Sequence, residues 1–127
     1  MTTKAQTVLI VEDEKPMARA LNLKLTHEGF AVEMVHDGLE AVSFLKKEPK
    51  KFDLIILDLV MPKLDGFGVL DKIKSMDISV PAIVLSNLSQ DEDRRRAEKL
   101  GARNFFVKSN TTLAQIVLEV KNILKST

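Results

Sequence analysis

The chain has 127 residues, a formal net charge of +1 and no cysteine. This length suits one domain with a core of its own, and we expect residues 1–127 to form a single domain. The near-neutral charge predicts neither direct nucleic-acid binding nor membrane association. The lack of cysteine excludes disulfides, thiol nucleophiles and Cys-based metal sites. The first residues do not resemble a signal peptide, and no apolar run approaches the ~20 residues of a membrane span, so we expect a cytoplasmic protein.

Short apolar runs alternate with segments of helical spacing along the whole chain. The runs predict strands at 8–11, 31–35, 53–57, 81–85 and 104–107. Apolar residues three and four apart predict helices at about 15–28, 38–47, 67–76 and 89–100, and a last one that starts near 111 or 112. This alternation is typical of a doubly wound α/β fold, with a five-stranded parallel sheet and helices on both faces. More than one strand order fits the pattern, and 2-1-3-4-5 is the order that we expect.

The segment from Leu54 to Gly66 is the one around which the other elements are arranged. Its first four residues are large and aliphatic, which indicates a strand buried on both faces. Asp58 follows directly, and a carboxylate at the end of a buried strand is costly unless a partner holds its charge. Pro62 and Gly66 then predict a turn. Open α/β sheets place their sites at this carboxyl edge.

Polar residues also end the other central strands. Glu12 and Asp13 follow the first strand, Ser86 ends the fourth and Lys108 follows the fifth. Each alone is usually a turn residue, a cap or a solvated side chain, but in a parallel sheet they converge with Asp58 on one edge. Clustered carboxylates need a cation, and oxygen ligands favour Mg²⁺, with Mn²⁺ as an alternative. Such a site can stabilise a phosphoryl group in transfer, with Asp58 as the nucleophile.

A set of motifs distributed along the chain matches one known family. The motifs are Leu9-Ile10-Val11-Glu12-Asp13-Glu14, Asp37-Gly38-Leu39-Glu40-Ala41, Asp58-Leu59-Val60-Met61-Pro62, Asp65-Gly66, Ser86, Leu100-Gly101-Ala102 and Lys108. With them, the sequence resembles over essentially its whole length the receiver domain of bacterial two-component response regulators. The resemblance implies the flavodoxin-like strand order 2-1-3-4-5, which the family is known for.

The resemblance also implies a role for each site residue. Asp58 would accept a phosphoryl group from a histidine kinase or phosphotransfer protein, or from a small donor such as acetyl phosphate. Asp13, Asp58 and the backbone carbonyl of Val60 would bind Mg²⁺ directly, and Glu12 would act mainly through water. Lys108 would pair with a phosphoryl oxygen. The protein would be a signalling switch that catalyses only its own phosphorylation and dephosphorylation.

Two further residues would form the switch. Ser86 would move toward the phosphoryl group, and Phe105 would turn inward behind it. The surface of the fourth helix, fifth strand and fifth helix would then dock a downstream protein or a second copy of the chain. We identify no effector domain in this sequence, so we expect output through another protein, or the chain to be one piece of a longer one.

Some positions depart from the family pattern. Ser109 replaces the proline that usually follows the lysine, which puts the usual cis peptide in doubt. Val60 and Leu88 are apolar and flank the site, which predicts slow attack by water on the phosphoryl group. We interpret Arg94-Arg95-Arg96 as a solvated helix face, with partner docking as the alternative.

Three other functions are alternatives to the switch. A phosphatase of the haloacid dehalogenase type needs a second acid two residues after the first, where this chain has Val60. A flavin or nucleotide module cradles phosphate with a Gly- or Ser/Thr-rich loop, where this chain has Glu12-Asp13-Glu14. A degenerate receiver would work unphosphorylated, yet all the site residues are present.

Overall fold

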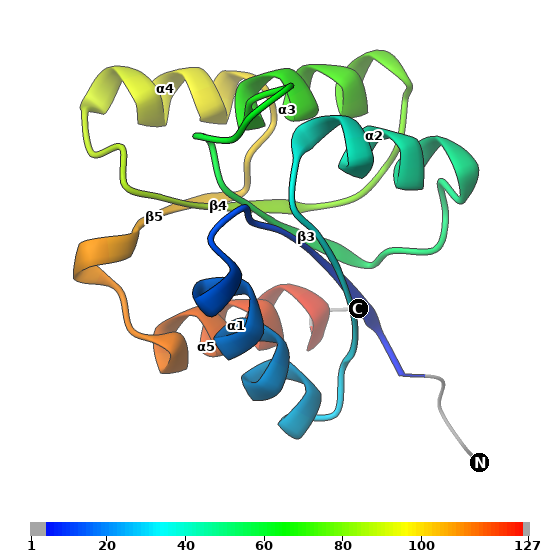
Figure 1. Ribbon diagram of the computed structural model, residues 1–127, viewed down its shortest axis with the longest axis vertical. Helices are drawn as coiled ribbons and strands as arrows, with labels where there is room; N and C mark the ends of the chain where they lie inside the picture. Colours follow the sequence, from blue (N-terminus) through cyan, green and yellow to red (C-terminus); the bar gives the residue numbers. More distant parts are fainter. Residues whose placement is uncertain (1–4, 126–127) are drawn as a thin grey trace.

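A computed structural model describes residues 5–125, which form a parallel five-stranded sheet. The strand order is β2-β1-β3-β4-β5, as expected, so β1 and β3 lie next to each other near the middle of the sheet. All neighbouring strands pair in parallel, which brings their carboxyl ends to one edge (Figure 1). The strands are β1 (Thr7–Val11), β2 (Ala31–Val35), β3 (Leu54–Leu57), β4 (Ala82–Ser86) and β5 (Asn104–Val107).

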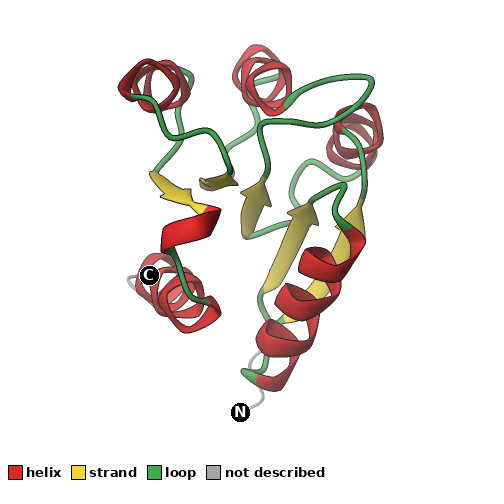
Figure 2. Ribbon diagram, turned by 60° about the vertical axis from the view of Figure 1, so that its left-hand side comes forward, coloured by secondary structure: helices red, strands yellow, loops and turns green. Residues whose placement is uncertain are grey.

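Helices cover both faces of the sheet and create two hydrophobic cores (Figures 1 and 2). On one face lie α1 (Lys15–His27) and α5 (Leu113–Lys125). On the other lie α2 (Gly38–Lys47), α3 (Gly66–Ser75) and α4 (Asp91–Lys99). Side chains of a strand alternate between the two faces, and helices cover both faces. Every residue of β3 and β4 is therefore buried, and both strands are continuous apolar runs up to Ser86.

Local signals in the sequence set most of the helix ends. Asp37 and Asp65 cap α2 and α3 by accepting hydrogen bonds from Glu40 N and Gly68 N, both at 2.8 Å. Gly101 has a φ of 103°, the left-handed conformation that ends a helix at low cost for glycine. Helix α4 begins at Asp91 and not at Ser89, because its N-cap is Gln90 and acids fill its first turn.

Candidate functional site

Asp58 follows β3 at the carboxyl edge of the sheet, and the first turn of α3 lies close against it. Its backbone N–H donates to Val11 O at 2.9 Å, and its residue is only 4% exposed. Gly66, the first residue of α3, lies against it: a Cβ built at Gly66 would be 2.3 Å from Asp58 O. Glycine is therefore required there, so that the helix can begin directly beside the acid.

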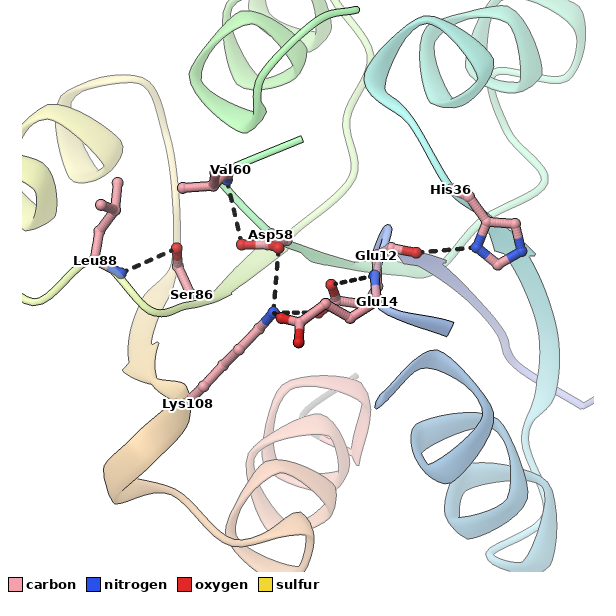
Figure 3. A network of polar contacts seen from close by, with 8 residues as sticks. All are labelled: Glu12, Glu14, His36, Asp58, Val60, Ser86, Leu88 and Lys108. Carbon is pink, nitrogen blue, oxygen red and sulfur yellow. Dashed lines mark hydrogen bonds and ion pairs between the residues drawn. The ribbon is translucent and has the colours of Figure 1, made fainter. Parts of the chain in front are cut away.

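Lys108 joins the ends of three segments that are distant in the sequence. It follows β5 and opens a short 3₁₀ turn, η1 (Lys108–Asn110). Its Nζ lies 2.8 Å from Glu12 Oε1, 2.6 Å from Glu14 Oε1 and 3.2 Å from Asp58 Oδ2 (Figure 3). The predicted convergence of Glu12, Asp58 and Lys108 is thus present in the structure.

This cluster holds more acidic groups than basic ones, and burial raises the free-energy cost of keeping the acids ionised. Glu12 is 2% exposed, and its burial raises the pKa of its carboxyl group to about 7, against the opposing hydrogen bond from Lys108. Burial alone would lower the pKa of Lys108, but hydrogen bonds to Glu12 and Glu14 and the charge of Asp58 outweigh it and raise that pKa. One ammonium group therefore faces three carboxyl groups, and the site favours a further cation.

The donor set at this edge fits a hard divalent ion. Oxygen atoms of Glu12, Glu14 and Asp58 all lie within 4.8 Å of one another, and the group contains neither histidine nor cysteine. Asp13, which the family resemblance implies as a ligand, is half-buried and lies outside this group in the part of the chain that the structure describes. Glu14 was missed as a site residue, although it completes a run of three acids after β1.

The backbone that carries Glu12 is held from β2. His36 Nδ1 lies 3.0 Å from Glu12 O, a contact that requires the proton on Nδ1 (Figure 3). His36 N in turn donates to Glu40 Oε1 at 3.1 Å. Glu12 also accepts from Glu14 N at 3.1 Å through Oε2, so both carboxylate oxygens of Glu12 are occupied. The acid is therefore fixed in position as well as buried.

The hydroxyl of Ser86 is engaged away from the acids. Ser86 is fully buried, and its Oγ accepts from Leu88 N at 3.3 Å. Within residues 5–125 no hydrogen bond joins Ser86 to Asp58 or Lys108. Val60 N donates to Asp58 Oδ1 at 3.3 Å, while the residue itself is 56% exposed beside the acid (Figure 3).

The structure gives the isomer of the peptide bond after Lys108 and the surroundings of the three arginines of α4. The structure has no cis peptide bond between residues 5 and 125, so the Lys108–Ser109 bond is trans. All three arginines at 94–96 are exposed, as expected of a solvated face. Two of them nevertheless lie over aromatic rings, Arg94 over Phe105 and Arg96 over Phe67. Phe105 itself is buried.

Residues 8–121 match the family model of the response regulator receiver domain. Among curated relatives, a probable transcriptional regulator ycf27 from Porphyridium aerugineum is 39% identical over 103 residues, which are 81% of this chain and 42% of the relative. The response regulator ArlR of Staphylococcus aureus is 34% identical over 118 residues, 93% of this chain and 52% of ArlR. The chain thus spans about half the length of the curated relatives that it matches.

Solved structures agree with the family match. The Francisella response regulator 1452 receiver domain superimposes with a TM-score of 0.87 at 28% identity, covering 95% of this chain and 98% of that one. A chain of the CheX-CheY-BeF3-Mg²⁺ complex from Borrelia burgdorferi gives 0.87 at 31% identity, covering 94% and 89%. No helix in residues 5–125 is long and apolar enough to cross a bilayer. The chain belongs to the response regulator receiver domains of two-component systems.

Proposed function

We propose that Asp58 accepts a phosphoryl group and that the domain is a switch controlled by this reaction. The observation that carries the proposal is the pairing of buried Asp58 with Lys108 Nζ at 3.2 Å. A carboxylate oxygen of Asp58 would attack phosphorus and form an O–P bond. The bond from phosphorus to the histidine nitrogen of the donor, or to the acetate oxygen of acetyl phosphate, would break, and its electron pair would leave with the donor.

Lys108 is placed to hold charge that develops during this transfer. Its side chain is 6% exposed and already contacts Asp58, so an oxygen of a phosphoryl group on Asp58 would lie within its reach. Ser86 ends the neighbouring strand β4 and would donate its hydroxyl to another phosphoryl oxygen once it leaves Leu88 N. These residues hold the group from two sides.

The acids of the edge would hold Mg²⁺, or Mn²⁺ in its place. Glu12, Asp58 and Glu14 supply carboxylate oxygens of suitable spacing, and Asp13 and the carbonyl of Val60 are the further ligands that the family resemblance implies. When bound, the ion would neutralise negative charge on the phosphoryl oxygens. The Borrelia burgdorferi relative was solved with BeF3 and Mg²⁺, which supports this reading.

The remaining parts of the proposal concern partners and location. We infer a histidine kinase or phosphotransfer protein as the donor. We also infer a downstream protein, or a second copy of the chain, that docks on the surface formed by α4, β5 and α5. One arginine of α4 on this surface, Arg94, contacts Phe105 of β5, so a change in β5 would reach the exposed face. We place the domain in the cytoplasm, where two-component phosphotransfer takes place.

Intact-mass measurement after incubation with acetyl phosphate and Mg²⁺ tests the phosphoacceptor. We expect one phosphate adduct on the wild type and none on Asp58→Ala. Asp71→Ala, which removes an exposed acid from α3, is the matched control and keeps the adduct. An adduct on Asp58→Ala, or none on the wild type, would refute the assignment.

Thermal unfolding tests the metal separately from phosphorylation. A ligand that binds only the folded state raises the melting temperature as its concentration exceeds the Kd. Millimolar MgCl₂ should therefore stabilise the wild type more than Asp58→Ala, because that variant lacks one carboxylate of the group. Equal stabilisation of both proteins would argue against a specific site at Asp58.

A further inference from the structure

Two of the three consecutive arginines of α4 lie over aromatic rings. Arg94 Cζ is 4.9 Å from the ring centroid of Phe105, and Arg96 Cζ is 4.0 Å from that of Phe67. No such contact of Arg95 is found among residues 5–125. A guanidinium group over a ring is attracted by the ring's negative face. Arg94 and Arg96 are therefore each held against an aromatic ring, whereas Arg95 between them is not.

Arg94 holds Phe105 at a second point. Its Nη1 donates to Phe105 O at 3.3 Å, and Phe105 N donates to Asn104 Oδ1 at 2.8 Å. Strand β5 lies at the edge of the sheet, where backbone groups that face away from β4 lack a strand partner. Arg94 thus supplies a bond that the sheet cannot, and it covers the ring of the same residue, which is only 4% exposed.

Phe105 connects this contact to the site. It pairs with Val84 of β4, two residues before Ser86, so Val84, Ser86 and Phe105 point to the same face of the sheet. Val84 and Phe105 share one hydrophobic core. A movement of Ser86 toward Asp58 would take place beside the Phe105 ring, and close packing makes the two positions interdependent.

We propose that Arg94 is a positioning residue that holds the Phe105 ring in its buried position and makes α4 follow β5 when the charge at Asp58 changes. The second part rests on the proposed function, whereas the hold on the ring does not. One cation–π contact and one hydrogen bond from a charged donor together correspond to about a tenfold change in the population of exposed ring.

Fluorine NMR of protein labelled with 3-fluorophenylalanine measures the position of the ring. The chain has six phenylalanines, and Phe105→Leu assigns the resonance of interest. The shift between H₂O and D₂O reports exposure to solvent. In unphosphorylated protein we expect Arg94→Met to raise the exposed fraction of Phe105 about tenfold. Arg94→Lys should recover only part of the loss, because an ammonium group lacks the flat stacking surface.

Neighbouring arginines give matched controls. Arg95→Met removes the same charge from the same helix and should leave the Phe105 resonance unchanged. Arg96→Met should move the Phe67 resonance and not that of Phe105. The proposal is overturned if Arg94→Met leaves Phe105 unchanged, or if Arg95→Met changes it equally. Urea unfolding of each variant ensures that only folded protein is compared.

Acetyl phosphate with Mg²⁺ tests the coupling. In the wild type, the Phe105 resonance and the amide signals of α4 should change together with the fraction of adduct measured by mass. In Arg94→Met, the α4 amide signals should change less than the Phe105 resonance at the same fraction of adduct. An identical response of the wild type and Arg94→Met would overturn the coupling. If the wild type gains no adduct, the proposed function fails, while the measurement on unphosphorylated protein still decides whether Arg94 holds the ring.

Discussion

Replacing Lys108 by methionine keeps most of the side chain's length but removes its charge, so it isolates the electrostatic role of the ammonium group. In the wild type this group contacts Glu12 at 2.8 Å and Asp58 at 3.2 Å, and both acids are almost fully buried. Removing one partner of a buried ion pair costs about 3–5 kcal/mol, because the remaining charge is left without compensation. That loss is a large share of the roughly 5–15 kcal/mol that stabilises a typical domain.

Urea unfolding in metal-free buffer at neutral pH measures this cost. With a slope of about 2 kcal/mol per molar urea, the midpoint of Lys108→Met should fall by about 2 M. Lys121→Met is the control, since Lys121 pairs with Glu28 in a more accessible position where an ion pair contributes about 0–1 kcal/mol. The reasoning is refuted if Lys108→Met unfolds at the wild-type midpoint, or if Lys121→Met is equally destabilised.

Gly66→Ala would place a Cβ 2.3 Å from Asp58 O, so we expect a loss of about 1–3 kcal/mol in urea unfolding and slower phosphorylation by acetyl phosphate, whereas the close contacts of a Cβ in Gly68→Ala are with the side chain of Leu64 and not with backbone. The pKa of Glu12 rises from its ordinary 4.5 to about 7 on folding, so its contribution to stability is present below pH 4.5 and is lost as the pH rises through 7. The difference in unfolding free energy between wild type and Glu12→Gln should therefore fall over this window in metal-free buffer, by at most about 1.4 kcal/mol per pH unit; a flat difference would contradict it. Apolar Val60 cannot orient water beside Asp58, so Val60→Asn should shorten the lifetime of the phosphorylated protein severalfold, and a short wild-type lifetime would count against this prediction.

Interactions close in the sequence were predictable from the sequence, because each depends on a few neighbouring residues. Asp65 was placed at the turn before α3, and the structure shows that it caps that helix. Gly29 and Gly101 directly follow the helices predicted at about 15–28 and 89–100, and both adopt positive φ. The convergence of Asp58 and Lys108 also followed, since parallel strands must present their carboxyl ends at one edge.

Contacts between distant segments needed the tertiary structure. Hydrophobic periodicity left more than one strand order open, because the central strands are apolar on both faces whichever neighbours they have. The position of Glu14 beside Lys108, across 94 residues of sequence, depends on how β1 and β5 are spaced by β3 and β4. Arg94 was expected to be a solvated residue of a charge run, and only the packing of α4 on the edge strand places it over Phe105. The sequence by itself determined the elements and the chemical groups at their ends, whereas the tertiary structure decided which of these groups share a partner, because distances between segments are set by packing and not by local pattern.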